Sequence, residues 1–132
     1  SLFIAEFTRT RNFQEGVAEA VNGKCRIRTP AGSILHSEAG AVEGPVIFGI
    51  RPEELDLLPA GEAGGNENHL KARVVQVRFR PSFLEVELDA GFPLIAYHPW
   101  NKGSSGRIAE GDEVRIHVRP EAVLVFQKKP AP

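Results

Sequence analysis

The stretch VIFGIRPEELDLL at residues 46–58 decides the fold, because a similar stretch, VRIHVRPEAVLVF, occurs at residues 114–126. In both, an alternating apolar run leads into Arg-Pro-Glu and is followed by a second short apolar run. Alternation at period two predicts a strand with one buried face. Proline fixes φ at about −65° and removes a backbone donor, so it ends strand pairing and turns the chain. The sequence therefore predicts a strand, a corner and a second strand, built twice.

The two Arg-Pro-Glu segments are interpreted as structural corners. Each glutamate is expected either to cap its turn or to pair with an arginine, and this structural role is favoured over a catalytic carboxylate–arginine pair. The corner residues are Arg51, Pro52, Glu53, Arg119, Pro120 and Glu121.

The rest of the chain is typical of short strands joined by Gly/Pro turns. The adjacent Val74 and Val75 break strict alternation and indicate a β-bulge, and Asp89 to Gly91 supply a hairpin turn. This pattern predicts an all-β barrel or sandwich. Strands or hairpins are predicted at residues 24–29, 34–37, 45–50, 55–58, 69–79, 82–98, 111–118 and 122–126.

The repeat divides the chain into two similar halves joined by a Gly-rich connector. Each half runs from a strand that follows an asparagine, Asn12 or Asn68, to its Arg-Pro-Glu corner. We expect a first unit at residues 9–60 and a second at 61–132. Because about five short strands leave their sheet edges uncovered, the two units are expected to share one core.

Composition is that of a globular domain. The 132 residues are 42% hydrophobic and 25% charged, with a formal net charge of −1, which gives no overall attraction to nucleic acid or anionic membrane. A single cysteine, Cys25, excludes an internal disulfide framework and fits a reducing compartment. No apolar run approaches the roughly 20 residues of a membrane span. Methionine is absent and the chain opens on SLFIAEF, so we expect it to be part of a longer protein.

Motifs for chemistry are weak. No P-loop occurs, so phosphates of ATP cannot be held in that manner. The four histidines have no metal-ligand spacing, and Cys25 lies on the apolar side of its strand and is expected in the core. Ser104 and Ser105 belong to a flexible loop that an anion could occupy. Trp100 belongs to the same segment, and we expect it either to pack beneath that loop or to anchor a partner.

The repeated segments resemble a known family. FIAEF, RNFQEG, GIRPEELDLL and GDEVRIHVRPEAVLVF look like the C-terminal region of the ATP-binding subunits of ABC importers, which holds TOBE domains, OB-like β-barrels. The resemblance implies an all-β fold of two OB-like TOBE units. It also implies that residues 1–8 carry the end of a short helix, connecting to a nucleotide-binding domain outside this chain.

Within that family, the layout is similar to the molybdate-binding Mop type. Mop units open on a Ser-x-Arg-Asn segment, which Arg11 and Asn12 match in part, with Thr8 and Thr10 nearby. In the second unit Asn68 remains, preceded by Glu67. This resemblance is compatible with an oxyanion ligand such as molybdate, tungstate or sulfate, while iron, sugar and polyamine importers carry similar regions, so the solute stays open. The candidate ligand-binding residues are Thr10, Arg11, Asn12, Asn68, Ser104 and Ser105.

The resemblance also implies a function. The chain would be a non-catalytic regulatory and dimerisation domain at the cytoplasmic face of the cell membrane. Its partners would be its own copy, the nucleotide-binding domain of the same chain and the permease subunits. No cofactor is expected here, whereas ATP and Mg²⁺ would belong to the nucleotide-binding domain.

The alternative is an OB-fold module that binds single-stranded nucleic acid. Residues 69–83 interleave basic side chains with Phe79 and Phe83, a surface on which bases stack. Against this, Glu85 and Glu87 on the following strand favour cross-strand ion pairs on a solvated face. The basic residues concerned are Lys71, Arg73, Arg78 and Arg80.

Overall fold

The computed structural model describes residues 12–59, 67–99 and 108–128 of the chain. Within these ranges the backbone forms strands and two single-turn 3-10 helices, which confirms the predicted all-β fold. The expected end of an N-terminal helix lies outside them. No helix in the described ranges is long and apolar enough to cross a membrane.

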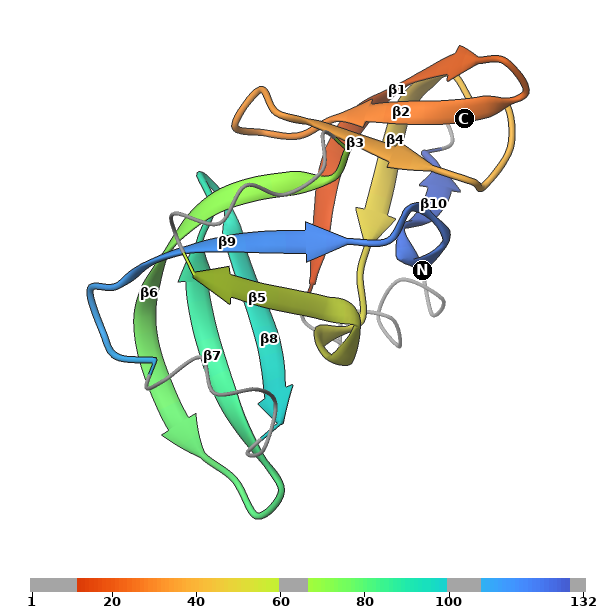
Figure 1. Ribbon diagram of the computed structural model, residues 1–132. Coiled ribbons are helices and arrows are strands. Elements are labelled where there is room, and N and C mark those ends of the chain that lie inside the picture. Colours follow the sequence, from red (N-terminus) through yellow and green to blue (C-terminus); the bar gives the residue numbers. More distant parts are fainter. Residues whose placement is uncertain (1–11, 60–66, 100–107, 129–132) are drawn as a thin grey trace.

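The strands form two five-stranded antiparallel sheets (Figure 1). The first sheet has the order β10-β4-β1-β2-β3 and the second the order β5-β9-β6-β7-β8. The first-half strands are β1 (Phe13–Val21), β2 (Lys24–Arg28), β3 (Ile34–Ser37), β4 (Gly44–Gly49) and β5 (Leu55–Pro59). The second-half strands are β6 (His69–Phe79), β7 (Phe83–Asp89), β8 (Pro93–Pro99), β9 (Glu113–Val118) and β10 (Leu124–Gln127).

The two halves exchange their last strands. After its corner, the first half sends β5 to pair with β9 in the second sheet, and the second half sends β10 to pair with β4 in the first sheet. Figure 1 shows both crossings, with β10 beside β4 and β5 beside β9. The proposed division into units 9–60 and 61–132 stays a prediction, since each sheet contains one strand from across that boundary.

A single apolar core joins the sheets, as expected for two OB-like units that share an interior. Side chains alternate between core and surface, so β9 buries Val114, Ile116 and Val118 while Arg115 and His117 face outward. Burial of a large apolar side chain contributes about 1.5–3 kcal/mol. Core residues with 0% exposure from both sheets are Ile27, Leu35, Val46, Phe48, Val86, Ala96, Ile116 and Val118.

Two local predictions in the second half are confirmed. The pairing of β6 with β7 shifts register between Val74 and Gln76, which is the predicted bulge. The β7–β8 turn places Gly91 at φ +89°, and its N–H donates to Asp89 Oδ1 at 2.8 Å. A side chain at this φ would be strained, which explains the glycine.

The two corners are the 3-10 turns η2 (Pro52–Glu54) and η3 (Pro120–Ala122). In each, proline follows an arginine with φ of −65°, and no side-chain hydrogen bond caps the turn. Arg119 forms an ion pair with Glu54 of the other corner. The pKa of Arg119 is raised, first by its hydrogen bond and charge interaction with Glu54 and to a smaller extent by Glu121. The corners are therefore joined to one another through Glu54.

The buried thiol gives a test of the core. Cys25 is 2% exposed, and burial raises the pKa of its thiol, with a hydrogen bond to Ser37 acting in the opposite direction. We expect a thiol-specific reagent to modify native Cys25 slower than the urea-unfolded chain by about two orders of magnitude or more. Rapid labelling of the native protein would contradict this packing.

Candidate functional site between the two units

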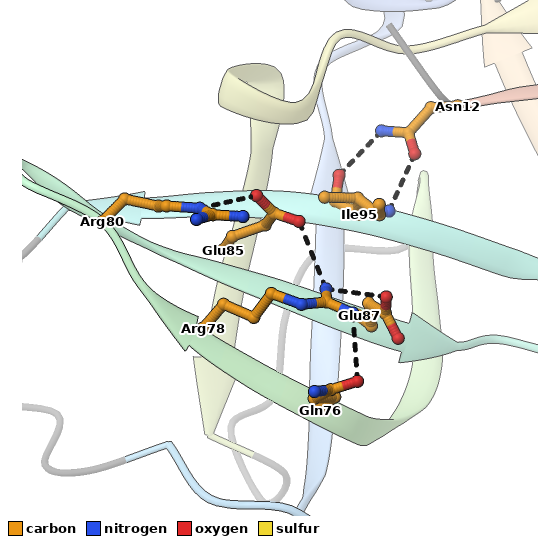
Figure 2. A network of polar contacts seen from close by, with 7 residues as sticks. All are labelled: Asn12, Gln76, Arg78, Arg80, Glu85, Glu87 and Ile95. Atoms are coloured by element: carbon orange, nitrogen blue, oxygen red, sulfur yellow. Dashed lines mark hydrogen bonds and ion pairs between the residues drawn. The ribbon is translucent and has the colours of Figure 1, made fainter.

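The asparagines that open the two halves bind each other's units. Asn12 Nδ2 donates to Ile95 O at 2.8 Å, and Ile95 N donates to Asn12 Oδ1 at 2.7 Å (Figure 2). Asn68 makes the same pair of bonds with His36, at 2.9 Å and 2.7 Å. Each amide thus satisfies one N–H and one C=O of an opposing strand.

The strands that receive these bonds are sheet edges. Ile95 lies in β8 and His36 in β3, the outermost strands of the second and first sheets. An edge strand exposes unpaired backbone groups, and the asparagine amide supplies the hydrogen bonds of one further peptide unit. We call the two contacts the asparagine clamps, defined by Asn12 with Ile95 and Asn68 with His36.

The clamps also continue into the backbone of their own half. Ile50 N donates to Asn12 O at 3.2 Å, and Val118 N donates to Asn68 O at 3.1 Å. Asn12 and Asn68 are 1% and 2% exposed. Asn68 has φ +57°, a left-handed conformation that asparagine tolerates better than most residues. Each clamp therefore ties the residue just before the corner of one unit to the edge strand of the other.

The predicted ligand-binding residues are distributed unevenly. Thr10, Arg11, Ser104 and Ser105 lie outside the described residues. Asn12 and Asn68 do not meet in one place, because each serves a different pair of strands and its amide is occupied by backbone. A role of these six residues in ligand binding stays a prediction.

Two of the four basic residues expected to form a nucleic-acid surface, Arg78 and Arg80, are paired with glutamates (Figure 2). Arg78 contacts Glu85 at 3.3 Å and Glu87 at 2.8 Å, and Arg80 Nε contacts Glu85 at 3.1 Å. The pKa of Arg78 is raised, chiefly by its hydrogen bond to Glu87. The predicted cross-strand pairs are confirmed. The expectation that they lie on a solvated face is wrong for Glu85, which is 4% exposed. A buried carboxylate requires such partners because desolvation alone would disfavour its charge.

Sequence reasoning missed a histidine pair on the outer face of the second sheet. His69 and His117 are cross-strand partners with ring centroids 4.6 Å apart, and His117 Nδ1 lies 3.7 Å from Asp56 Oδ2. The pKa of His69 is lowered, first by burial and then by His117 and Arg115. No group of three potential metal ligands occurs within the described residues. Only the strand register reveals this pairing.

The role of Asn68 in its clamp can be tested against Asn22, which also has a positive φ but lies in a turn. Glycine at position 68 should lower stability more than glycine at position 22. Asn68→Gly removes the two part-buried hydrogen bonds with His36, so we expect the free energy of unfolding to fall by about 2–4 kcal/mol. Asn22→Gly, in an exposed turn with φ +52°, is the matched control and should cost less than about 1 kcal/mol. Equal losses in urea denaturation would show that the clamp adds nothing to stability.

The histidine pair predicts a pH dependence. Because the folded state lowers the pKa of His69, the unfolded chain binds more protons below about pH 6.5, and the free energy of unfolding falls as the pH decreases through that range. His69→Phe copies Phe13, which occupies the equivalent position after Asn12. This variant should flatten that part of the profile, measured by urea denaturation between about pH 5 and pH 8. Profiles that stay parallel would contradict the assignment to His69.

Comparison with known proteins agrees with this architecture. The sequence matches the TOBE domain family over residues 48–126. No curated protein sequence matches the chain. A solved structure of the cytoplasmic molybdate-binding protein ModG, with molybdate bound, is similar at a TM-score of 0.74 and 15% identity, covering 88% of this chain and 95% of that one. That similarity concerns the fold. Since the family match spans more than half of the residues, the chain belongs to the TOBE domain family.

Proposed function

We propose that this chain is the regulatory region of an ATP-binding subunit of an ABC importer, that it pairs two such subunits, and that it binds a tetrahedral oxyanion. The observation that carries the proposal is the pair of five-stranded sheets in a chain of the TOBE domain family, whose halves exchange strands and clamp one another. An inseparable pair of units suits a rigid accessory domain that transmits the position of one subunit to the next.

The proposed role is non-catalytic. ATP and Mg²⁺ would bind a nucleotide-binding domain of the same protein, outside this chain. The permease subunits would be contacted through that domain at the cytoplasmic face of the membrane. The chain itself would face a second copy across a two-fold axis and keep two ATPase domains in register.

Oxyanion binding is supported by the shared fold with ModG, described as a molybdate-binding protein. A tetrahedral dianion is held by several converging N–H, hydroxyl and cationic donors. A ligand that prefers one arrangement of the paired subunits shifts the equilibrium toward it, by no more than its difference in affinity. Regulation by the transported solute would operate in this way.

A panel of oxyanions tests the ligand. At 100 times its dissociation constant a ligand adds about 2.7 kcal/mol to stability, which raises the melting temperature by several degrees. We expect molybdate, tungstate or sulfate to produce this shift and chloride at matched ionic strength to produce none. Identical melting curves throughout would remove oxyanion binding from the proposal and leave a dimerisation domain.

Sedimentation tests the pairing separately. We expect analytical ultracentrifugation of the protein to show a reversible dimer whose population grows with concentration. A species that remains monomeric at the highest attainable concentration would contradict the pairing role, whatever the oxyanion panel shows.

A further inference from the structure

Two like charges face each other on the outer face of the second sheet. Lys71 of β6 and Arg115 of β9 are direct cross-strand partners. Their side chains point away from the core, because the alternate residues Leu70 and Ile116 are 5% and 0% exposed. Like charges placed directly opposite each other destabilise a sheet. An arrangement of this kind calls for a compensating negative charge.

Within the described residues, no ion pair compensates the charges of Lys71 and Arg115. Arg115 Nε is buried and has no hydrogen-bond partner among the described residues, and its neighbour on β5 is the apolar Leu58. No ion pair joins Lys71 or Arg115 to the described part of the chain. By contrast, Arg78 is paired with two glutamates. An unpaired buried guanidinium N–H is costly, so Arg115 Nε is a donor that lacks an acceptor among the residues the structure describes.

The same residues border a surface hollow. It has a volume of about 680 Å³ and is lined by Lys71, Arg73 and Arg115, together with Asp89 and Glu113. The Asp89 carboxylate already accepts a hydrogen bond from the turn at Gly91. Three cations against two carboxylates leave the hollow positive.

We infer that this hollow binds a small tetrahedral oxyanion, with the Arg115 guanidinium and the Lys71 ammonium as its principal donors and Arg73 at its border. The planar guanidinium fork matches two oxygens of such an ion, and the lysine adds a compact charge. The inference rests on the oxyanion part of the proposed function, and it places the ligand away from the asparagine clamps.

A small ion suits this hollow better than a nucleic-acid strand. An extended phosphate backbone needs a continuous basic track. Here the carboxylates of Asp89 and Glu113 line the hollow, and Arg78 and Arg80 further along β6 and its turn are bound to Glu85. The positive surface is therefore local, as a site for one compact dianion requires.

Substitutions at the two donors test the site by calorimetric titration with sulfate, phosphate and molybdate. We expect Arg115→Gln and Lys71→Gln each to weaken binding about tenfold or more, since each removes a charge-assisted hydrogen bond. The matched control is Arg28→Gln on β2, an exposed arginine of the first sheet that changes net charge equally. Its affinity should stay within about twofold of the parent.

A second variant separates binding from folding. Arg115→Met keeps the aliphatic packing and removes the unpaired guanidinium, so in anion-free buffer it should melt at or above the parent temperature. A clear loss of stability would show that Arg115 has a structural role and would overturn the inference.

The remaining outcomes are distinguishable. If the parent binds an oxyanion and both donor variants bind it equally well, the proposed function stands and this site is wrong. If the parent binds no oxyanion, the oxyanion part of the proposed function fails and this site fails with it. Binding of a single-stranded oligonucleotide in place of every small ion would also overturn the site.

Discussion

The exposed edges of two small sheets are the constraint on which the rest of this structure depends. Backbone N–H and C=O groups at an edge must be paired or left to water, and an uncovered edge invites association. Here the asparagine clamps of Asn12 and Asn68 each pair one such N–H and C=O across the units. An amide side chain suits this task because it carries one donor and one acceptor side by side, as a peptide does.

The exchange of strands between the halves covers further sheet edges. By giving β5 to the second sheet and β10 to the first, each half completes the other, and the 3-10 corners set the crossing points. The ion pair of Arg119 with Glu54 then joins the corners. Covering the core thus requires both halves, which explains why the chain repeats the pattern of strand, corner and strand.

Local features were predictable from sequence, whereas long-range pairing was not. Alternation identified most of the strands, proline the corners, the Val74–Val75 pair the bulge and Gly91 the turn, because each depends on neighbouring residues. The exchange of β5 and β10 depends on partners about 55–63 residues away for β5 and about 75–81 residues away for β10, which local periodicity does not reveal. For the candidate site, sequence singled out Asn12 and Asn68 but not their clamping contacts. The opposition of Lys71 and Arg115, and the burial of Glu85, appear only once strand register is known.

The exchanged strands also govern the order in which the chain acquires its structure. The first sheet is completed by β10, the last of the described strands, so β4 keeps an open edge until residue 127 has emerged from the ribosome. Contacts between such distant segments require closure of long loops, which slows folding. The first half is consequently exposed to other nascent chains for the whole time that the second half is being made.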